Sequence, residues 1–366
     1  MVISPSTSTT PPTSGQHGHC VAQSFFDLES TLAYLSADLD GQISGAAEFP
    51  SAEQVAGRVR ETLDRPLSED LSGWVEAYAR HGRRDPYLWR WCRQAVEVTT
   101  LPCVLPSLRD ELLDTKTLGV MFDVLLDDVA DRHGSAKFLE ELVHLPVGHT
   151  APDFSQFGAE SRAYGEFTRK LWEAILARAR KYPCYVEYAD LLRFDYLQLC
   201  NVMRYSHLLN SRLELLNTAE HDLYTPHNMH IMICSTFDLM CSPQFDRGEL
   251  GILRDCIWHV QWMGRIGNLV TTWQRELAEG DFTSGVYARA VTNGDVTVEQ
   301  LRRVSRDQLE VAIAAGGHEL FFLRRWREHR QYVLSKKPLI RSFDLGDLLD
   351  GFNFLICLHL ASRGRK

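Results

Sequence analysis

Four aspartates lie within a short stretch that is otherwise rich in Val, Leu and Ala, FDVLLDDVADRHG at 122–134. If this stretch is helical, Asp123, Asp127 and Asp131 share one face at intervals of four residues, with Asp128 beside them. Like charges at that spacing repel one another. The apolar residues between them predict that at least one side of the helix is buried, and buried carboxylates require a positive partner.

The partner of this aspartate cluster is not supplied by its own helix. No Lys or Arg occurs between Lys116 and Arg132, so the positive charge must come from elsewhere. Mg²⁺ is the leading candidate, because proteins bind it through a few carboxylates together with substrate phosphates. The alternative is a solvated acidic face, which is the common fate of charge runs on helices.

A second set of oxygen-bearing side chains follows in GRIGNLVTTWQRELAEGDFTSGV, at 264–286. Asn268, Thr272 and Glu276 recur every four residues, so a helix presents an amide, a hydroxyl and a carboxylate on one face. These are ligands for a hard cation. Arg275 lies beside Glu276 and is placed to bond a phosphate oxygen. Helix surfaces also produce such a pattern by chance, so its weight comes from pairing with the aspartate cluster.

The elements that must position these two motifs are predicted to be helices. From Phe25 onwards the apolar residues follow helical periodicity, and neither strand-type alternation nor an internal repeat is evident. The predicted helices cover 51–63, 71–82, 86–98, 107–132, 135–145, 158–182, 185–215, 225–241, 247–278, 297–334 (two helices separated at Gly316–Gly317) and 344–362. Several helices separate the motifs, which is enough to bring them face to face across the cavity of a bundle.

Composition limits the class of protein. Hydrophobic residues make up 45% of the chain and charged residues 24%, typical of a globular protein with an ample core. The net charge of −9 argues against nucleic acid as a partner. No apolar run is long enough to span a membrane. Nine cysteines without CxxC pairs suggest reduced core residues in a cytoplasmic protein.

The sequence therefore predicts an all-α protein of two parts. Residues 1–20 are rich in Ser, Thr and Pro and are expected to form a disordered tail. Residues 21–366 are expected to form a single helical domain of about ten helices.

On its two motifs the chain resembles a class I terpene synthase of the bacterial type. That family carries a DDxx(D/E) motif on one helix and an N(D/N)xx(S/T)xx(K/R)(D/E) motif on another, about as far apart as here. The matching residues are Asp127, Asp128 and Asp131 in the first motif and Asn268, Thr272, Arg275 and Glu276 in the second. Leu269 stands where the family usually has Asn or Asp.

The resemblance implies a terpene cyclase, a lyase built as a helical bundle around a central cavity. Three Mg²⁺ ions would hold the diphosphate of an isoprenyl substrate while its carbocation forms and cyclises. The implied metal ligands are Asp127, Asp128, Asp131, Asn268, Thr272 and Glu276, with Asp127, Asp128 and Arg275 serving catalysis and Arg275 and Arg363 binding the diphosphate. Phe122 is a candidate aromatic wall residue. A homodimer is compatible with the resemblance.

The chain departs from the family pattern at two places. The family's diphosphate-sensing Arg would fall at Asp222, and HDLYTPHNMHIM around it contains no Arg. His227, Asn228 or an Arg from another helix are the candidate replacements. The family's C-terminal Arg-Tyr pair is also missing, and Arg363 and Arg365 are the nearest residues that could take its place.

Two alternative functions and the length of the substrate stay open. A chain-elongating prenyltransferase shares the fold but typically has two aspartate-rich motifs, and a non-catalytic helical interaction protein would carry the acids on its surface. Among cyclase substrates, geranylgeranyl diphosphate is favoured over farnesyl diphosphate because the sensor Arg is missing. Small residues at Cys234, Ser235 and Thr236 would leave room for the longer chain. His227 and His230 lack a second histidine at metal-binding spacing.

Overall fold

The computed structural model describes residues 28–36, 51–131, 135–148 and 150–363, and every regular element in these ranges is a helix. The predicted tail at 1–20 lies outside the described residues. The α-helices are α1 Leu28–Ser36, α2 Ala52–Asp64, α3 Glu69–Tyr78, α4 Tyr87–Val98, α5 Arg109–Asp131, α6 Ala136–Val147, α7 Ala159–Ala179, α8 Tyr185–Ser211, α9 Thr218–Tyr224, α10 Ile231–Met240, α11 Leu250–Glu279, α12 Gly285–Asn293, α13 Val298–Arg303, α14 Arg306–Ala315, α15 His318–Ser335 and α16 Leu345–Ala361. Short 3₁₀ helices are η1 Pro106–Leu108, η2 Leu213–Leu215, η3 Thr225–Met229, η4 Arg247–Glu249 and η5 Lys337–Leu339.

The predicted all-α class is confirmed, and the two helices that carry the motifs lie where the sequence places them. The aspartate cluster ends α5, and the second motif occupies the C-terminal half of α11. The segment predicted as one helix at 225–241 is instead divided into η3 and α10. Likewise 297–334 contains an additional break between α13 and α14, besides the predicted break at the two glycines.

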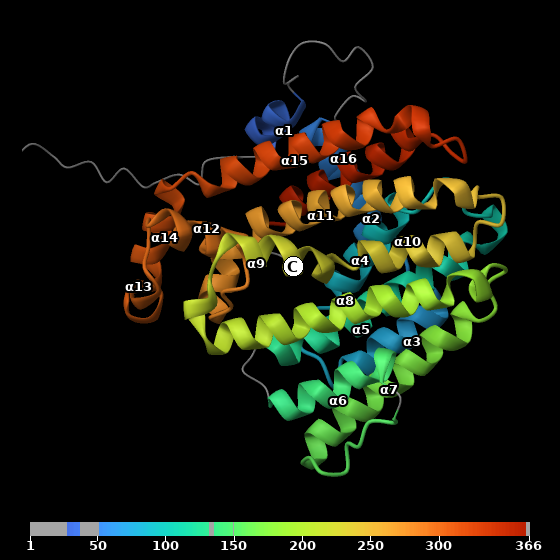
Figure 1. Cartoon of the computed structure of the whole chain (residues 1–366), viewed down its shortest axis with the longest axis horizontal. Coiled ribbons are helices and arrows are strands. Elements are labelled where there is room, and N and C mark those ends of the chain that lie inside the picture. Colours follow the sequence, from blue (N-terminus) through green and yellow to red (C-terminus); the bar gives the residue numbers. More distant parts are fainter. Residues whose placement is uncertain (1–27, 37–50, 132–134, 149, 364–366) are drawn as a thin grey trace, which may run out of the picture.

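The long helices form two packed groups with the motif helices at their centre (Figure 1). Helix α11 packs against α15 and α16, whereas α5 packs against α4, α7 and α8. The η3 and α10 segment lies between α8 and α11 and contacts both. One continuous hydrophobic core joins helices from α1 to α16. This arrangement places the ends of α5 and α11 on two sides of a shared space.

Local sequence determines where α10 and α11 begin and end. Helix α11 stops at Gly280, whose φ of 78° lies in the left-handed region that glycine adopts without strain. Ser284 then caps α12 by accepting from the Val286 amide. Helix α10 begins after His230, the only non-glycine residue with positive φ (60°) in the described part of the chain. Histidine tolerates this conformation poorly compared with glycine, so other contacts must hold it.

A buried ion pair ties α5 to α10. The Lys116 ammonium lies 2.8 Å from Asp238 Oδ1 and 2.9 Å from the Thr100 hydroxyl, and both charged side chains are almost fully buried. The second carboxylate oxygen of Asp238 accepts from the Leu101 amide at 3.0 Å. All of these groups come from segments that are distant in the sequence, so the pair forms only when α4, α5 and α10 are packed together.

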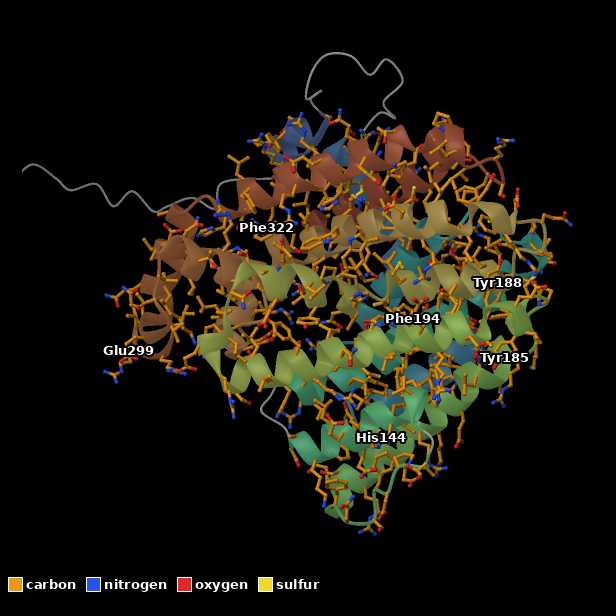
Figure 2. All side chains as sticks on the ribbon, in the orientation of Figure 1. His144, Tyr185, Tyr188, Phe194, Glu299 and Phe322 are labelled. Atoms are coloured by element: carbon orange, nitrogen blue, oxygen red, sulfur yellow. The ribbon has the colours of Figure 1, made fainter. Side chains whose placement is uncertain are left out.

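Side-chain burial distinguishes the outside of the bundle from its core (Figure 2). Phe194 of α8 is 52% exposed on the outside of the bundle, whereas Phe322 of α15 is buried. Phe122, predicted as a cavity wall, instead packs in the core against the rings of Trp172 and Tyr196. The described cysteines are all free and mostly buried, as predicted. Among the described helices, none is long and apolar enough to cross a membrane.

Candidate functional site

The two motifs line the same cavity, which has a volume of about 200 Å³. Its walls come from α4, the C-terminal half of α5, η3, the start of α10, α11 and the end of α16. One part of the lining is polar and includes Arg84, Asp123, Asp127, Asp131, Asn228, Arg265, Asn268, Thr272, Arg275, Glu276 and Asp281. The other part is largely apolar and includes Leu88, Trp91, Val96, Val120, Val124, Met229, Ile231, Cys234 and Leu355.

Three of the four clustered aspartates face the cavity, as the helical spacing predicts. Asp127 accepts a hydrogen bond from the Asn228 side-chain amide of η3 at 3.0 Å. Asp123 is buried, and its Oδ1 has no partner. Oδ1 of Asp131 is likewise buried without a partner. Burial, with the charge of Asp127, raises the pKa of both Asp123 and Asp131 well above the ordinary range of a carboxyl group.

Asp128 has a different environment from the other three. It does not line the cavity, and its carboxylate is paired with the Arg84 guanidinium at 2.9 and 3.0 Å. The Tyr78 hydroxyl lies 3.4 Å from its second oxygen. Arg84 also lies 3.7 Å from Asp127, so one arginine spans both carboxylates. This arginine, from the loop before α4, is the positive partner that the sequence requires but does not identify.

The second motif places its three predicted ligands in the cavity lining from α11. The Thr272 hydroxyl lies 2.6 Å from Glu276 Oε1, and Glu276 Oε2 is buried without a partner. Asn268 Oδ1 accepts from Arg265 at 3.3 Å. Burial raises the pKa of Glu276 to about 7, and the charge of Asp281 adds to the effect. Leu269, the departure from the family motif, points into the core and is fully buried.

The two motifs lie close enough to interact electrostatically. The charge of Asp281, just after α11, and that of Glu276, on α11, both contribute to the raised pKa of Asp131 on α5. Asp281 is held in place by the Asn210 side-chain amide and the Thr283 backbone amide, each at 3.0 Å. Asp281 was not predicted as a site residue, although it lies in the same sequence stretch as the second motif, 264–286.

Three arginines contribute positive charge to the lining: Arg84, Arg265 and Arg275. Of these, only Arg275 was predicted from the sequence. Arg265 is buried, donates to the Thr283 carbonyl at 3.2 Å, and has an unpartnered Nε. It precedes Asn268 by one helical turn, so the face of α11 could have revealed it. Nothing in the spacing of the aspartate cluster indicates Arg84.

The predicted replacements for the missing family arginines lie in different environments, and only one of those that the structure describes lines the cavity. Asp222, at the sensor position, pairs with Arg325 at 2.9 Å. His227 packs against Trp258 outside the cavity lining, whereas Asn228 contacts Asp127 inside it. The guanidinium of Arg363 does not line the cavity and instead donates to Glu319 and to the Val270 carbonyl. Arg365 lies outside the described residues.

Of the three small residues predicted to leave room for the substrate, only one lines the cavity. Cys234 lines it, but Thr236 donates to Asp195 and Ser235 to the Met232 carbonyl, and neither reaches the cavity. Among the described lining residues, Trp91 supplies the large aromatic ring. The His359 ring packs against it in a T-shaped arrangement, with the ring centroids 4.8 Å apart. The wall therefore offers one large π face for a cation.

The polar lining has the donor chemistry of a magnesium site, although its ligands do not converge on one point. Among the described residues, no group of three or more His, Cys, Asp or Glu side chains is close enough together to hold a metal ion. The lining nevertheless combines carboxylate, amide and hydroxyl oxygens, which suit a hard cation. Two carboxylate oxygens that a cation would satisfy are buried without partners, on Asp131 and Glu276.

Comparison with known proteins identifies the fold. No protein-family model matches the chain, and no curated protein matches it by sequence. Solved structures do match. Isoprene synthase from grey poplar leaves (Populus x canescens), in complex with three Mg²⁺ ions and dimethylallyl-S-thiolodiphosphate, has a TM-score of 0.56 at 14% identity, covering 91% of this chain and 59% of the synthase.

A second structure of the poplar isoprene synthase gives a TM-score of 0.56 at 13% identity, covering 90% of this chain and 58% of that one. The chain thus spans less than two thirds of the length of the synthases it matches. The helical fold is thus shared with the poplar isoprene synthase. At this identity the likeness shows the fold, and the chemistry must be argued from the site.

Proposed function

We propose that the chain is a class I terpene cyclase of the bacterial type, which ionises an isoprenyl diphosphate and cyclises the resulting carbocation to a terpene. The observation that carries this proposal is the shared cavity: the aspartates of α5 and the Asn268, Thr272 and Glu276 face of α11 line its polar part. An apolar part adjoins it. A substrate with a charged head and a hydrocarbon tail suits such a divided site.

Magnesium is the cofactor that the polar lining fits, and three ions are expected, the number bound by the poplar isoprene synthase. Asp127 and Asp131 on one side and Asn268, Thr272 and Glu276 on the other would hold it. Bound there, magnesium would neutralise the charge that develops on the departing diphosphate. Asp128, predicted as a further ligand, is engaged by Arg84, so we assign it to orient that arginine toward the cavity.

The chain's own cations would bind the diphosphate oxygens. Arg84, Arg265 and Arg275 all line the polar part of the cavity. Arginine presents several donors in a fixed fork and matches phosphate geometry. Arg265 and Arg275 each carry a buried Nε without a partner, which leaves a donor for such a ligand. These residues would take the role of the diphosphate-sensing Arg, whose position is occupied here by Asp222.

Two observations bear on substrate length, and they point in opposite directions. The absence of Arg at position 222 is the reason to place geranylgeranyl ahead of farnesyl diphosphate. The cavity volume of about 200 Å³ lies below the usual range of about 300–1,000 Å³ for ligand pockets and favours a shorter chain. The poplar structure holds a five-carbon analogue. The test must therefore span chains from five to twenty carbons.

The deciding experiment supplies dimethylallyl, geranyl, farnesyl and geranylgeranyl diphosphate separately, each with Mg²⁺ or with a chelator. Magnesium-dependent diphosphate release with a cyclic hydrocarbon product is expected from at least one of them. Products that lengthen only when isopentenyl diphosphate is added would identify a chain-elongating prenyltransferase instead. No release from any of the four would leave a non-catalytic helical protein.

A matched pair of variants ties the activity to the cavity. Asp127→Asn should lose turnover, because it removes a carboxylate charge from the polar lining. Asp307→Asn changes an exposed aspartate at the start of α14 that does not line the cavity, and should behave like the parent chain. Cytoplasmic location and a homodimer stay predictions, the latter to be checked by light scattering.

A further inference from the structure

A second polar group lines the same cavity, one helical turn before Asp127 on α5, and the proposed function does not use it. It consists of Asp123 and His230, which line the cavity, and Tyr196 directly behind the imidazole. All three side chains are buried. Four of their polar atoms have no hydrogen-bond partner: Asp123 Oδ1, the Tyr196 hydroxyl and both ring nitrogens of His230.

The position of the His230 imidazole depends on the backbone conformation of His230 and on the space left by Gly119. His230 adopts φ 60° at the junction between η3 and α10, a strained conformation of the kind found at functional sites. Its Nε2 lies so close to α5 that a Cβ at Gly119 would be only 2.8 Å away. Gly119, Asp123 and Asp127 recur every four residues, so the imidazole lies on the face of α5 that carries the aspartates.

Burial, together with one nearby positive charge, favours the neutral form of His230. Burial, with the nearby Lys116, lowers its pKa to about 3. Lys116 is itself paired with Asp238, and Cys234 follows His230 by one turn of α10. Nδ1 of the imidazole lies 3.6 Å from Asp123 Oδ2, just beyond hydrogen-bonding distance. A neutral imidazole carries one acceptor nitrogen, and an adjacent carboxyl can stabilise the imidazolium that forms on protonation.

We propose that His230 accepts the proton whose loss from the carbocation ends the reaction, with Asp123 as its positioning residue. This inference rests on the proposed function. The C–H bond beside the cationic carbon breaks, its electron pair forms the new C=C bond, and the proton passes to a ring nitrogen of His230. The proton returns to solvent when the diphosphate and the alkene leave. This role would give a function to a buried imidazole whose ring nitrogens have no hydrogen-bond partner.

The test measures product and diphosphate together, using the diphosphate that the parent chain accepts. Asn tolerates positive φ but is not a base, so His230→Asn is the principal variant. We expect the parent alkene, per diphosphate released, to fall at least about tenfold, because a general base contributes about 10²–10⁴-fold. Alcohols or other alkenes should replace it. His227→Asn is the matched control, because His227 lies three residues before His230, in η3, but outside the cavity lining.

Two further variants keep the test decisive. If His230→Asn does not fold, His230→Gly repeats the measurement without the penalty for positive φ. Asp123→Asn should shift the product ratio in the same direction but by less. An unchanged ratio in a folded His230 variant would overturn the inference, as would an alcohol as the main product of the parent chain. No diphosphate release from the parent chain would overturn the proposed function as well, so the two failures are distinguishable.

Discussion

Replacing Arg84 by Met, which keeps the aliphatic stem but removes the guanidinium, is expected to lower the free energy of unfolding by about 3 kcal/mol. From the sequence, the clustered aspartates are expected to repel one another. In the structure, Asp128 has a positive partner in Arg84. Its carboxylate is 6% exposed and pairs with Arg84 at 2.9 Å, so the variant leaves a buried negative charge without its main partner.

The magnitude follows from burial and geometry. Removing one member of a buried ion pair costs about 3–5 kcal/mol. The lower end applies here because the Arg84 side chain is 20% exposed and the Tyr78 hydroxyl still lies 3.4 Å from Asp128. For a chain of this size, such a loss lowers the melting temperature by roughly 5 °C.

A double-mutant cycle measures the pair itself. Denaturant unfolding is compared for the parent chain, Arg84→Met, Asp128→Asn and the double variant, and a coupling of about 2 kcal/mol is expected. The matched control is Arg303→Met. Arg303 lies 2.6 Å from Glu299, but both are exposed side chains at the end of the bundle, so the change should stay below about 0.5 kcal/mol. Additivity of the Arg84 and Asp128 changes within about 0.5 kcal/mol would refute the reasoning.

Three other variants give separate checks. Asp127→Ala should abolish magnesium-dependent diphosphate release while the melting temperature stays nearly unchanged; activity close to that of the parent would contradict the assignment. Gly119→Ala should cost about 1–3 kcal/mol in urea unfolding, because the new Cβ meets the His230 ring. Burial lowers the pKa of His221 to about 4, so unfolded chains bind its proton first and stability falls as pH drops from about 6.5 toward 4. His221→Gln should flatten this slope; an unchanged slope would refute the assignment.

Helix positions and the two motif faces were predictable because they depend on local periodicity. The spacing of Asp123, Asp127 and Asp131 determined which side chains share a face of α5, and the same holds for Asn268, Thr272 and Glu276 on α11. Arg265 belongs to the same class of signal, because it lies one turn before Asn268. Arg265 lies outside the motif itself, so the motif pattern does not include it.

The remaining features depend on packing between distant segments. Arg84 reaches Asp128 across 44 residues, and no periodicity links the two. Phe122 could face either the cavity or the core from sequence, and the rings of Trp172 and Tyr196 decide for the core. The division of 225–241 at His230 was equally hidden, since its sequence contains neither a glycine nor a proline at the break.

The Lys116–Asp238 pair has a consequence for how the bundle opens. Separating α10 from α5 would strand an ammonium and a carboxylate in apolar surroundings, so partial detachment of either helix is unfavourable. The two helices are therefore expected to exchange their amide hydrogens through a common opening event, with similar protection in both. The wall of the cavity and the helix bearing the aspartates would then behave as one cooperative unit, although more than one hundred residues of chain separate them.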